Sequence, residues 1–131
     1  MNTPIFLSTE EVLGLHHMQL ERFGGMPGVR EPGLLESALA QPQAGFGGEY
    51  LHGDEFEMAA AYLFHIVMNH PFADGNKRTG LHAALTFLTL NCWVVEMPPD
   101  ELYTLVIAVT AGAADKTVIA IAFRSNSVPA E

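Results

Sequence analysis

The sequence is poor in cysteine, in positive charge and in long apolar runs. Its 131 residues include a single cysteine, Cys92, so no disulfide can form within the chain and a reducing compartment is expected. The longest weakly polar stretch, residues 102–114, is shorter than the roughly 20 apolar residues that cross a bilayer. Residues 1–7 have no basic segment before their short apolar stretch, so no secretory signal is expected. These absences predict a soluble, cytoplasmic protein.

Positive charge is the scarcest of these features. Six Lys and Arg residues stand against fifteen Asp and Glu, which gives a formal net charge of -9. A protein that holds DNA or an anionic membrane through charge needs a basic face, so neither partner is expected. Two of the six cations, Lys77 and Arg78, are adjacent.

Apolar residues, by contrast, are plentiful. They make up 49% of the chain, and the mean hydropathy is +0.20, which argues against disorder. A chain of this length fits one domain, residues 1–131, and buries about two thirds of its unfolded surface. Such a core needs neither a disulfide nor a metal.

The apolar residues recur at helical spacing almost throughout, which predicts an all-α bundle of five to six helices. A short extended piece is expected at 93–96, and residues 41–53 form a loop with four glycines. The expected helices cover residues 8–23, 32–40, 55–69, 76–90, 100–111 and 115–123.

Two of these helices carry a clear inward stripe. Ser8 and Glu11 form a capping box at the start of the first helix, and the glycines at 24–25 end it. Its predicted core residues are Val12, Leu15, Gln19 with Leu20, and Phe23. The stripe of the third helix comprises Phe56, Ala59 with Ala60, Leu63, Val67 and His70.

The segment that carries chemistry is His-Pro-Phe-Ala-Asp-Gly-Asn-Lys-Arg-Thr-Gly, residues 70–80. Pro71 disfavours helical backbone before it, so one helix ends near His70 and the next begins near Asn76. A helix N-terminus offers free N–H groups and attracts anions. The positive charges of Lys77 and Arg78 are unfavourable at this end of the helix dipole. Bound phosphates would explain why two cations are found there.

Each neighbouring side chain suits such a ligand. Arg78 can bind phosphate oxygens in pairs and Lys77 supplies a compact charge, while Gly75 lets phosphate approach the backbone. The side chain of Asn76 can donate to an anionic oxygen. Asp74 provides one carboxylate, which together with phosphate oxygens is a usual way to hold Mg²⁺.

His70 is the one plausible proton acceptor of the segment. The segment therefore combines a base, a metal ligand and a phosphate clamp, which suits transfer of a phosphorus group from a nucleotide to a hydroxyl. Simpler interpretations stay open: His70 could cap helix carbonyls, Asp74 could be an N-cap, and the pair at 77–78 could be a solvated patch. The other histidines show no ligand spacing, so no zinc site is expected; they are His16, His17, His52, His65 and His82.

The motif at 70–79 resembles the signature of the Fic/Doc superfamily, and most closely its death-on-curing (Doc) toxin branch. Residues 23–28 and 32–38 are similar to the amino-terminal half of that branch, so the resemblance covers roughly residues 7–112. It implies a Fic-like helical bundle with the catalytic loop between two central helices. A related flap, which aligns the target peptide in the wider family, would correspond to residues 45–53.

The resemblance also implies roles for individual residues. His70 would be the catalytic base, and Asp74 would hold the Mg²⁺ that accompanies ATP. Gly75, Asn76 and Arg78 would form the anion hole, with Lys77 beside them. Phe72 would pack into the core and fix the loop.

Two departures from the AMP-transferring pattern distinguish the Doc branch. Lys77 stands where those proteins carry a second glycine, and Leu81 stands where they carry a second arginine. The resemblance therefore implies transfer of the terminal phosphate of ATP to a threonine of elongation factor Tu, which halts translation. It also implies a small Phd-like antitoxin as partner. AMP transfer by the same groups, or an inactive module that binds only a peptide or nucleotide, remain the alternatives.

Overall fold

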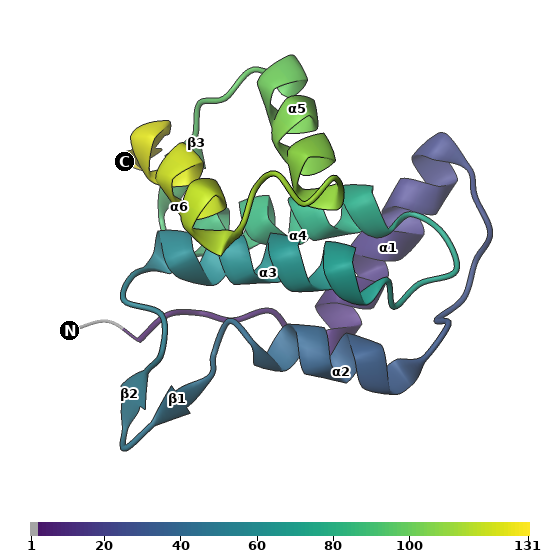
Figure 1. Cartoon of the computed structure of the whole chain (residues 1–131), viewed down its shortest axis with the longest axis horizontal. Coiled ribbons are helices and arrows are strands. Elements are labelled where there is room, and N and C mark those ends of the chain that lie inside the picture. Colours follow the sequence, from purple (N-terminus) through teal and green to yellow (C-terminus); the bar gives the residue numbers. More distant parts are fainter. Residues whose placement is uncertain (1–2) are drawn as a thin grey trace.

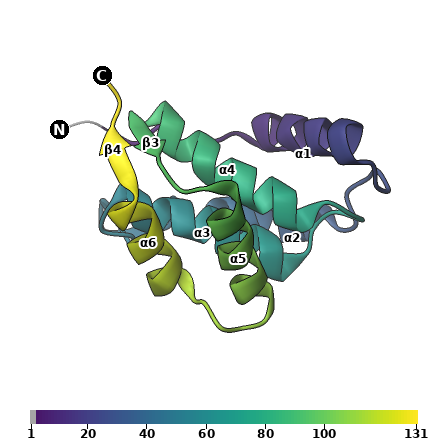
Figure 2. The same ribbon diagram turned by 90° about the horizontal axis from the view of Figure 1, so that it is seen from above.

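The computed structural model describes residues 3–131 and confirms the all-α class. Two antiparallel helices, α3 and α4, form the centre, and the other helices pack around them (Figures 1 and 2). The helices are α1 (Thr9–Phe23), α2 (Pro32–Ala40), α3 (Glu55–Asn69), α4 (Asn76–Leu90), α5 (Pro99–Thr110) and α6 (Lys116–Ser125). The short strands are β1 (Gly45–Phe46), β2 (Glu49–Tyr50), β3 (Trp93–Val95) and β4 (Ser127–Pro129).

The crossing of α3 and α4 is close at Gly80 of α4, which has no side chain. Ala59, Ala60 and Ala61 of α3 are fully buried. A Cβ at Gly80 of α4 would lie 3.1 Å from the side chain of Val67. This close packing sets the relative position of the end of α3 and the start of α4, which is where the predicted catalytic segment lies.

The start of α1 agrees with the sequence in detail. Ser8 is the N-cap, its hydroxyl accepts the Glu11 N–H at 3.1 Å, and the Glu11 carboxylate accepts the Ser8 N–H at 2.8 Å. The predicted inward stripe of α1 is right at Val12 and Gln19 and wrong at Phe23, which is 52% exposed. The residue pattern also does not single out His16, which is buried at 5% exposure.

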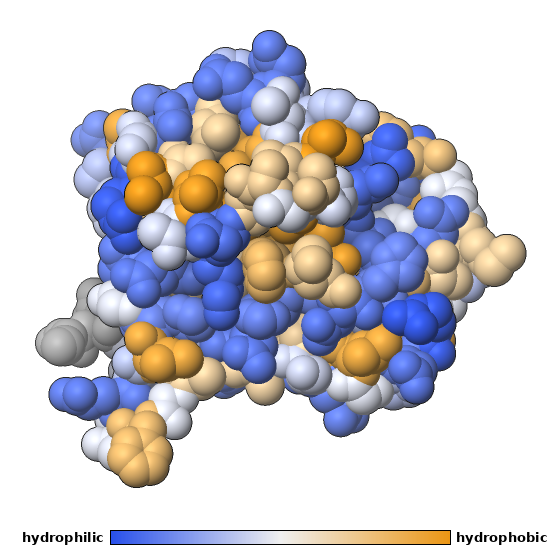
Figure 3. Space-filling model, viewed as in Figure 1, coloured by the Kyte–Doolittle hydropathy of each residue, from blue (hydrophilic) through white to orange (hydrophobic). Residues whose placement is uncertain are grey.

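The strands were the least predictable elements. The loop at 41–53 contains an antiparallel hairpin, β1–β2, which projects from the molecule with Phe46 94% exposed (Figures 1 and 3). The extended piece expected at 93–96 is β3, and it pairs with β4 near the carboxyl end. The two-residue strands of the hairpin have too little pattern to be found from one sequence, and β4, the partner of β3, lies far along the chain from it.

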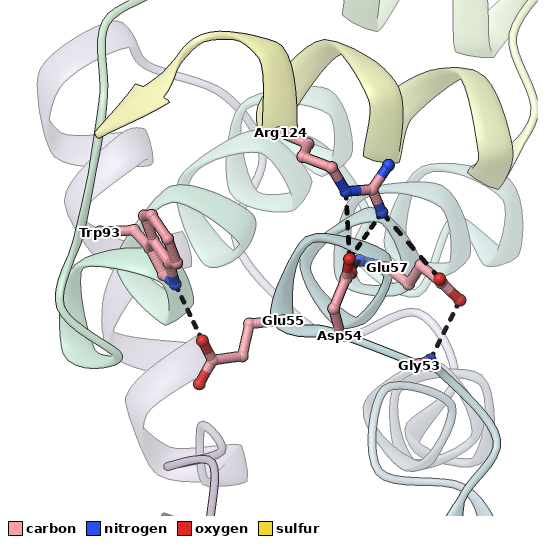
Figure 4. Close-up of polar contacts among 6 residues, drawn as sticks. All are labelled: Gly53, Asp54, Glu55, Glu57, Trp93 and Arg124. Carbon is pink, nitrogen blue, oxygen red and sulfur yellow. Dashed lines mark hydrogen bonds and ion pairs between the residues drawn. The ribbon is translucent and has the colours of Figure 1, made fainter. Parts of the chain in front are cut away.

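Polar contacts attach the carboxyl-terminal elements to the start of α3. Arg124 of α6 donates to the Asp54 carboxylate through Nε at 3.1 Å and Nη2 at 2.7 Å, and the indole N–H of Trp93 donates to Glu55 at 2.8 Å (Figure 4). Asp54 is also the N-cap of α3. Arg124 is therefore occupied by carboxylates and takes no part in the phosphate chemistry expected at 70–80.

The surface seen in Figure 3 is mostly hydrophilic. Apolar side chains gather on it over α6 and the α5–α6 connection, where Val118 and Ile121 are about half exposed. In residues 3–131 no helix is both long enough and apolar enough to span a membrane.

His65 on α3 makes the folded state sensitive to acid. Burial, together with the charge of Lys116, lowers the pKa of His65 from 6.5 to about 4, and burial lowers the pKa of His52 and of His82 as well. The unfolded chain therefore binds protons more readily than the folded one. The stabilising contribution of neutral His65 is complete above pH 6.5, and it is lost as the pH drops from 6.5 towards 4.

We expect the His65 part of this loss to be on the order of 1 kcal/mol, since the ring is only half buried. Urea unfolding of wild type and His65→Gln at pH 7 and pH 5 measures it. The variant should lose less stability between the two pH values than wild type, whereas His17→Gln, at an exposed position, should match wild type. An equal pH dependence in His65→Gln and wild type would contradict the role of His65.

Candidate active site

The segment predicted to carry chemistry forms the connection between α3 and α4, at the end of the molecule where the α1–α2 connection also lies (Figures 1 and 2). The two connections run antiparallel and are joined by backbone bonds. The Arg30 N–H donates to the Pro71 carbonyl at 2.7 Å, and the Ala73 N–H donates to the Gly28 carbonyl at 3.0 Å. Val29 and Phe72 form a β-bridge between them. Residues 26–30 are therefore the supporting segment of the predicted catalytic loop, residues 70–76.

Phe72 and Asn76 close the loop on itself. Phe72 is fully buried, as predicted. Its N–H donates to the Asn76 side-chain oxygen at 2.9 Å, and the Asn76 amide donates to the Phe72 carbonyl at 3.0 Å. Asn76 is itself only 4% exposed, so its side chain is used inside the loop. An anion at this helix start would meet the backbone N–H of Asn76 and not its amide group.

His70 is presented to solvent by an unusual backbone. It is the C-cap of α3 in the left-handed conformation, with φ 53 and ψ 54, and its side chain is exposed. It therefore lies beyond the buried face of α3, on which it was expected. The Asn76 amide donates to His70 Nδ1 at 3.2 Å, so the neutral ring in this orientation carries its proton on Nε2 and offers Nδ1 as acceptor.

Another residue, Arg30, caps the carbonyls at the end of α3. Its Nε donates to the His70 carbonyl at 3.0 Å and its Nη2 to the Asn69 carbonyl at 3.2 Å. The simpler interpretation of His70, as a side chain that caps carbonyls, is therefore wrong. Nothing in the local pattern around Arg30 reveals this contact, because the two segments are 40 residues apart.

Asp74 turns both carboxylate oxygens towards backbone N–H groups. One oxygen accepts from Gly75 at 2.9 Å and the other accepts from Met26 at 3.2 Å. The N-cap of α4 is Gly75, with φ 79 and no side-chain cap, so the N-cap interpretation of Asp74 is wrong. Asp74 is exposed, and each oxygen keeps a free lone pair, so the carboxylate fits a Mg²⁺ ligand.

Lys77 and Arg78 occupy the first turn of α4 and are both exposed. The Arg78 guanidinium lies 4.0 Å above the ring of Phe23, at the end of α1. Such a cation–π contact restricts the guanidinium without neutralising it. It also explains why Phe23 is not in the core: its ring supports the cation that was predicted to bind phosphate.

Gly25 provides a test of the support under Asp74. Its φ is +127, and a Cβ there would lie 2.9 Å from the Asp74 Oδ2 atom. We expect Gly25→Ala to displace the carboxylate and to destabilise the protein by about 1–3 kcal/mol. The measurements are thermal unfolding and the Mg²⁺ dependence of nucleotide binding.

Gly28→Ala is the matched control, since Gly28 has a similar φ of +112 and open space where a Cβ would lie. Both variants should lose stability, but Gly25→Ala alone should need more Mg²⁺. The same Mg²⁺ dependence in the two variants would show that Gly25 does not position Asp74.

Comparison with known proteins adds the family to this geometry. The sequence model of the Fic/DOC family matches residues 6–88, which include the catalytic loop and the supporting segment. The chain belongs to the Fic/DOC family. The Fic/DOC protein described here is 36% identical to "Protein kinase doc" of Escherichia phage P1 over 118 residues, which cover 90% of this chain and 92% of that protein.

A second relative places this Fic/DOC protein in the Doc branch as well. It is 42% identical to "Toxin Doc" of Mycolicibacterium smegmatis over 86 residues, 66% of this chain and 64% of that protein. Both similarities agree with the resemblance seen in the motif at 70–79.

One expectation from the wider Fic/DOC family does not fit the structure. The β1–β2 hairpin, in the region of the expected flap, precedes α3, whereas the catalytic loop follows it (Figure 1). The 15 residues of α3 separate the two by about 22 Å. The flap interpretation of residues 45–53 is therefore wrong, because the hairpin lies at the opposite end of α3 from the loop. The extended segment that lies beside the loop is the one around Val29.

Proposed function

We propose that this protein is a Doc-like toxin that transfers the terminal phosphate of ATP to a Thr or Ser hydroxyl of a protein. Membership of the Fic/DOC family and the two Doc relatives support a transferase and a toxin. Elongation factor Tu is the suspected target, and a Phd-like antitoxin the suspected partner. The single observation that carries the proposal is that one loop, hydrogen-bonded to residues 26–30, holds His70, Asp74 and the N-terminus of α4 close together.

In this reaction a bond forms between the acceptor oxygen and the terminal phosphorus, and the bond from that phosphorus to the bridging oxygen breaks. ADP leaves with the bridging oxygen and its electron pair. The hydroxyl proton passes to His70. In the observed orientation the acceptor is Nδ1, which must first release the hydrogen bond that it accepts from the Asn76 amide. The exposed position of the ring leaves room for a protein hydroxyl.

Charge around the phosphates comes from the start of α4. The N–H groups of Asn76, Lys77 and Arg78 belong to the first turn, and no side chain caps them. Lys77 and Arg78 add two cations, which neutralise charge that develops on the phosphate oxygens. Mg²⁺, when bound by Asp74 and the nucleotide, would neutralise further phosphate charge.

The alternative, AMP transfer, is less well supported by the side chains present. Leu81, at the place of the second arginine, is partly buried and packs against the hydrophobic core. It has no charge to hold the distal phosphates in the orientation that AMP transfer requires. Lys77 instead places a cation in the first turn of α4.

Incubation of the protein with ATP, Mg²⁺ and purified elongation factor Tu, followed by intact mass spectrometry, tests the proposal. A mass increment of one phosphate supports it, and an increment of one AMP supports the alternative. His70→Ala should give no increment. If wild type modifies neither this target nor any protein of a bacterial lysate, the inactive binding module is the remaining interpretation.

A further inference from the structure

We propose that His16, on α1, is a positioning residue for the catalytic loop. By holding the backbone of Asp74, its ring sets the place of the metal-binding carboxylate and of the α4 N-terminus. This inference rests on the proposed function of that loop, and it assigns a role to a histidine outside the motif at 70–80.

The first observation is a part-buried hydrogen bond across 58 residues of sequence. His16 Nε2 lies 2.8 Å from the backbone carbonyl oxygen of Asp74, and the side chain is 5% exposed. A carbonyl can only accept, so Nε2 carries the proton and donates it. Loss of this bond leaves the Asp74 carbonyl without its protein partner, so the backbone of the loop is held less firmly.

The second observation is a stack that holds the ring in place. The imidazole lies face to face with the ring of Phe72, with centroids 3.8 Å apart and planes 9° apart. Phe72 is fully buried and its N–H donates to Asn76, so the ring on which His16 stacks is itself packed in the core. The direction of the Nε2 donor is therefore fixed by the packing of the ring against Phe72.

The third observation is the position of the ring beside Gly75, the N-cap of α4. A Cβ added at Gly75 would lie 3.5 Å from Cδ2 of His16, so the ring lines the space next to this residue. One imidazole thus stacks on Phe72, donates to Asp74 and lies beside Gly75, in the turn between His70 and the start of α4. The supporting segment at 26–30 holds the loop from outside, and His16 holds it from α1.

Two substitutions separate the hydrogen bond from the packing. His16→Phe keeps an aromatic ring on Phe72 and removes the donor. His16→Gln removes the ring and keeps an amide donor close to the position of Nε2. A role in packing alone predicts that Phe is the better replacement, whereas positioning through the Asp74 carbonyl predicts that Gln is.

The experiment measures kcat, KM for the protein target, the apparent affinity for Mg²⁺, and amide hydrogen exchange of the loop. We expect His16→Phe to remain folded, to lose about 10- to 100-fold in kcat and in Mg²⁺ affinity, and to keep the target KM. Exchange should be faster at Phe72 and Thr79, whose N–H groups bond to Asn76 Oδ1 and to the Gly75 carbonyl. His16→Gln should recover at least part of both losses, and His17→Gln should behave as wild type.

Failure of this inference is distinct from failure of the proposed function. If wild type transfers phosphate and His16→Phe does so equally well, His16 has no positioning role. If wild type transfers nothing, hydrogen exchange is the deciding measurement. Unchanged protection of the Phe72 and Thr79 amides in His16→Phe contradicts the inference, and lost protection that returns in His16→Gln supports it.

Discussion

Replacement of His70 by Ala should reduce phosphate transfer by about 10²- to 10⁴-fold without unfolding the protein. The ring is exposed, and the Asn76 amide is the one side-chain group that bonds it within residues 3–131. Its removal therefore costs the reaction a proton acceptor and costs the fold little. Initial rates under saturating ATP and target measure the effect.

Backbone strain is the complication at this position, because His70 has a φ of 53. His70→Asn avoids it, since Asn tolerates the left-handed conformation well. Both variants should be equally slow and should have melting temperatures close to wild type, as should the surface control His17→Ala. Transfer by His70→Asn at more than about a tenth of the wild-type rate would exclude His70 as the base.

Phe72→Ala should destabilise the protein by about 3–5 kcal/mol, the largest loss of stability that we expect from one substitution. The ring is fully buried and lies between the core and His16. Its removal leaves a cavity, and it takes away the surface that orients His16. Urea unfolding gives the change, and phosphate transfer should fall with it.

Phe46→Ala is the matched control, because the same side chain at the tip of the hairpin is 94% exposed. That substitution should change the free energy of unfolding by less than about 0.5 kcal/mol. A loss below about 1 kcal/mol in Phe72→Ala would mean that the loop repacks around the cavity and does not depend on this ring.

The helices could be predicted because their ends are encoded locally. Ser8 with Glu11 marks the start of α1, and Pro71 follows the end of α3 directly. Of the strands, β3 was expected as an extended piece, but its partner could not be predicted, since the register pairs Trp93 with Pro129, far along the chain. In pairs this short, the contacts that stabilise the strands are tertiary and leave no periodic pattern in either segment.

The candidate active site shows the same contrast between local and distant residues. Every group that is expected to touch the nucleotide lies between His70 and Arg78, so a local motif was enough to predict these residues. The groups that hold these in place come from α1 and the connection after it: His16 bonds Asp74, Phe23 supports Arg78, and Arg30 caps α3. Their contribution depends on how distant segments meet, which residue types and spacing do not specify.

Labelled nucleotide distinguishes the two phosphorus groups of ATP that this protein could transfer to its target. Wild type is incubated with Mg²⁺ and the protein target, using ATP with radioactive phosphorus at the terminal position in one sample and at the innermost position in another. For a kinase we expect label in the target from the terminal position alone, and none with His70→Asn. Label from the innermost position would contradict kinase activity, because that phosphorus reaches the target only through AMP transfer.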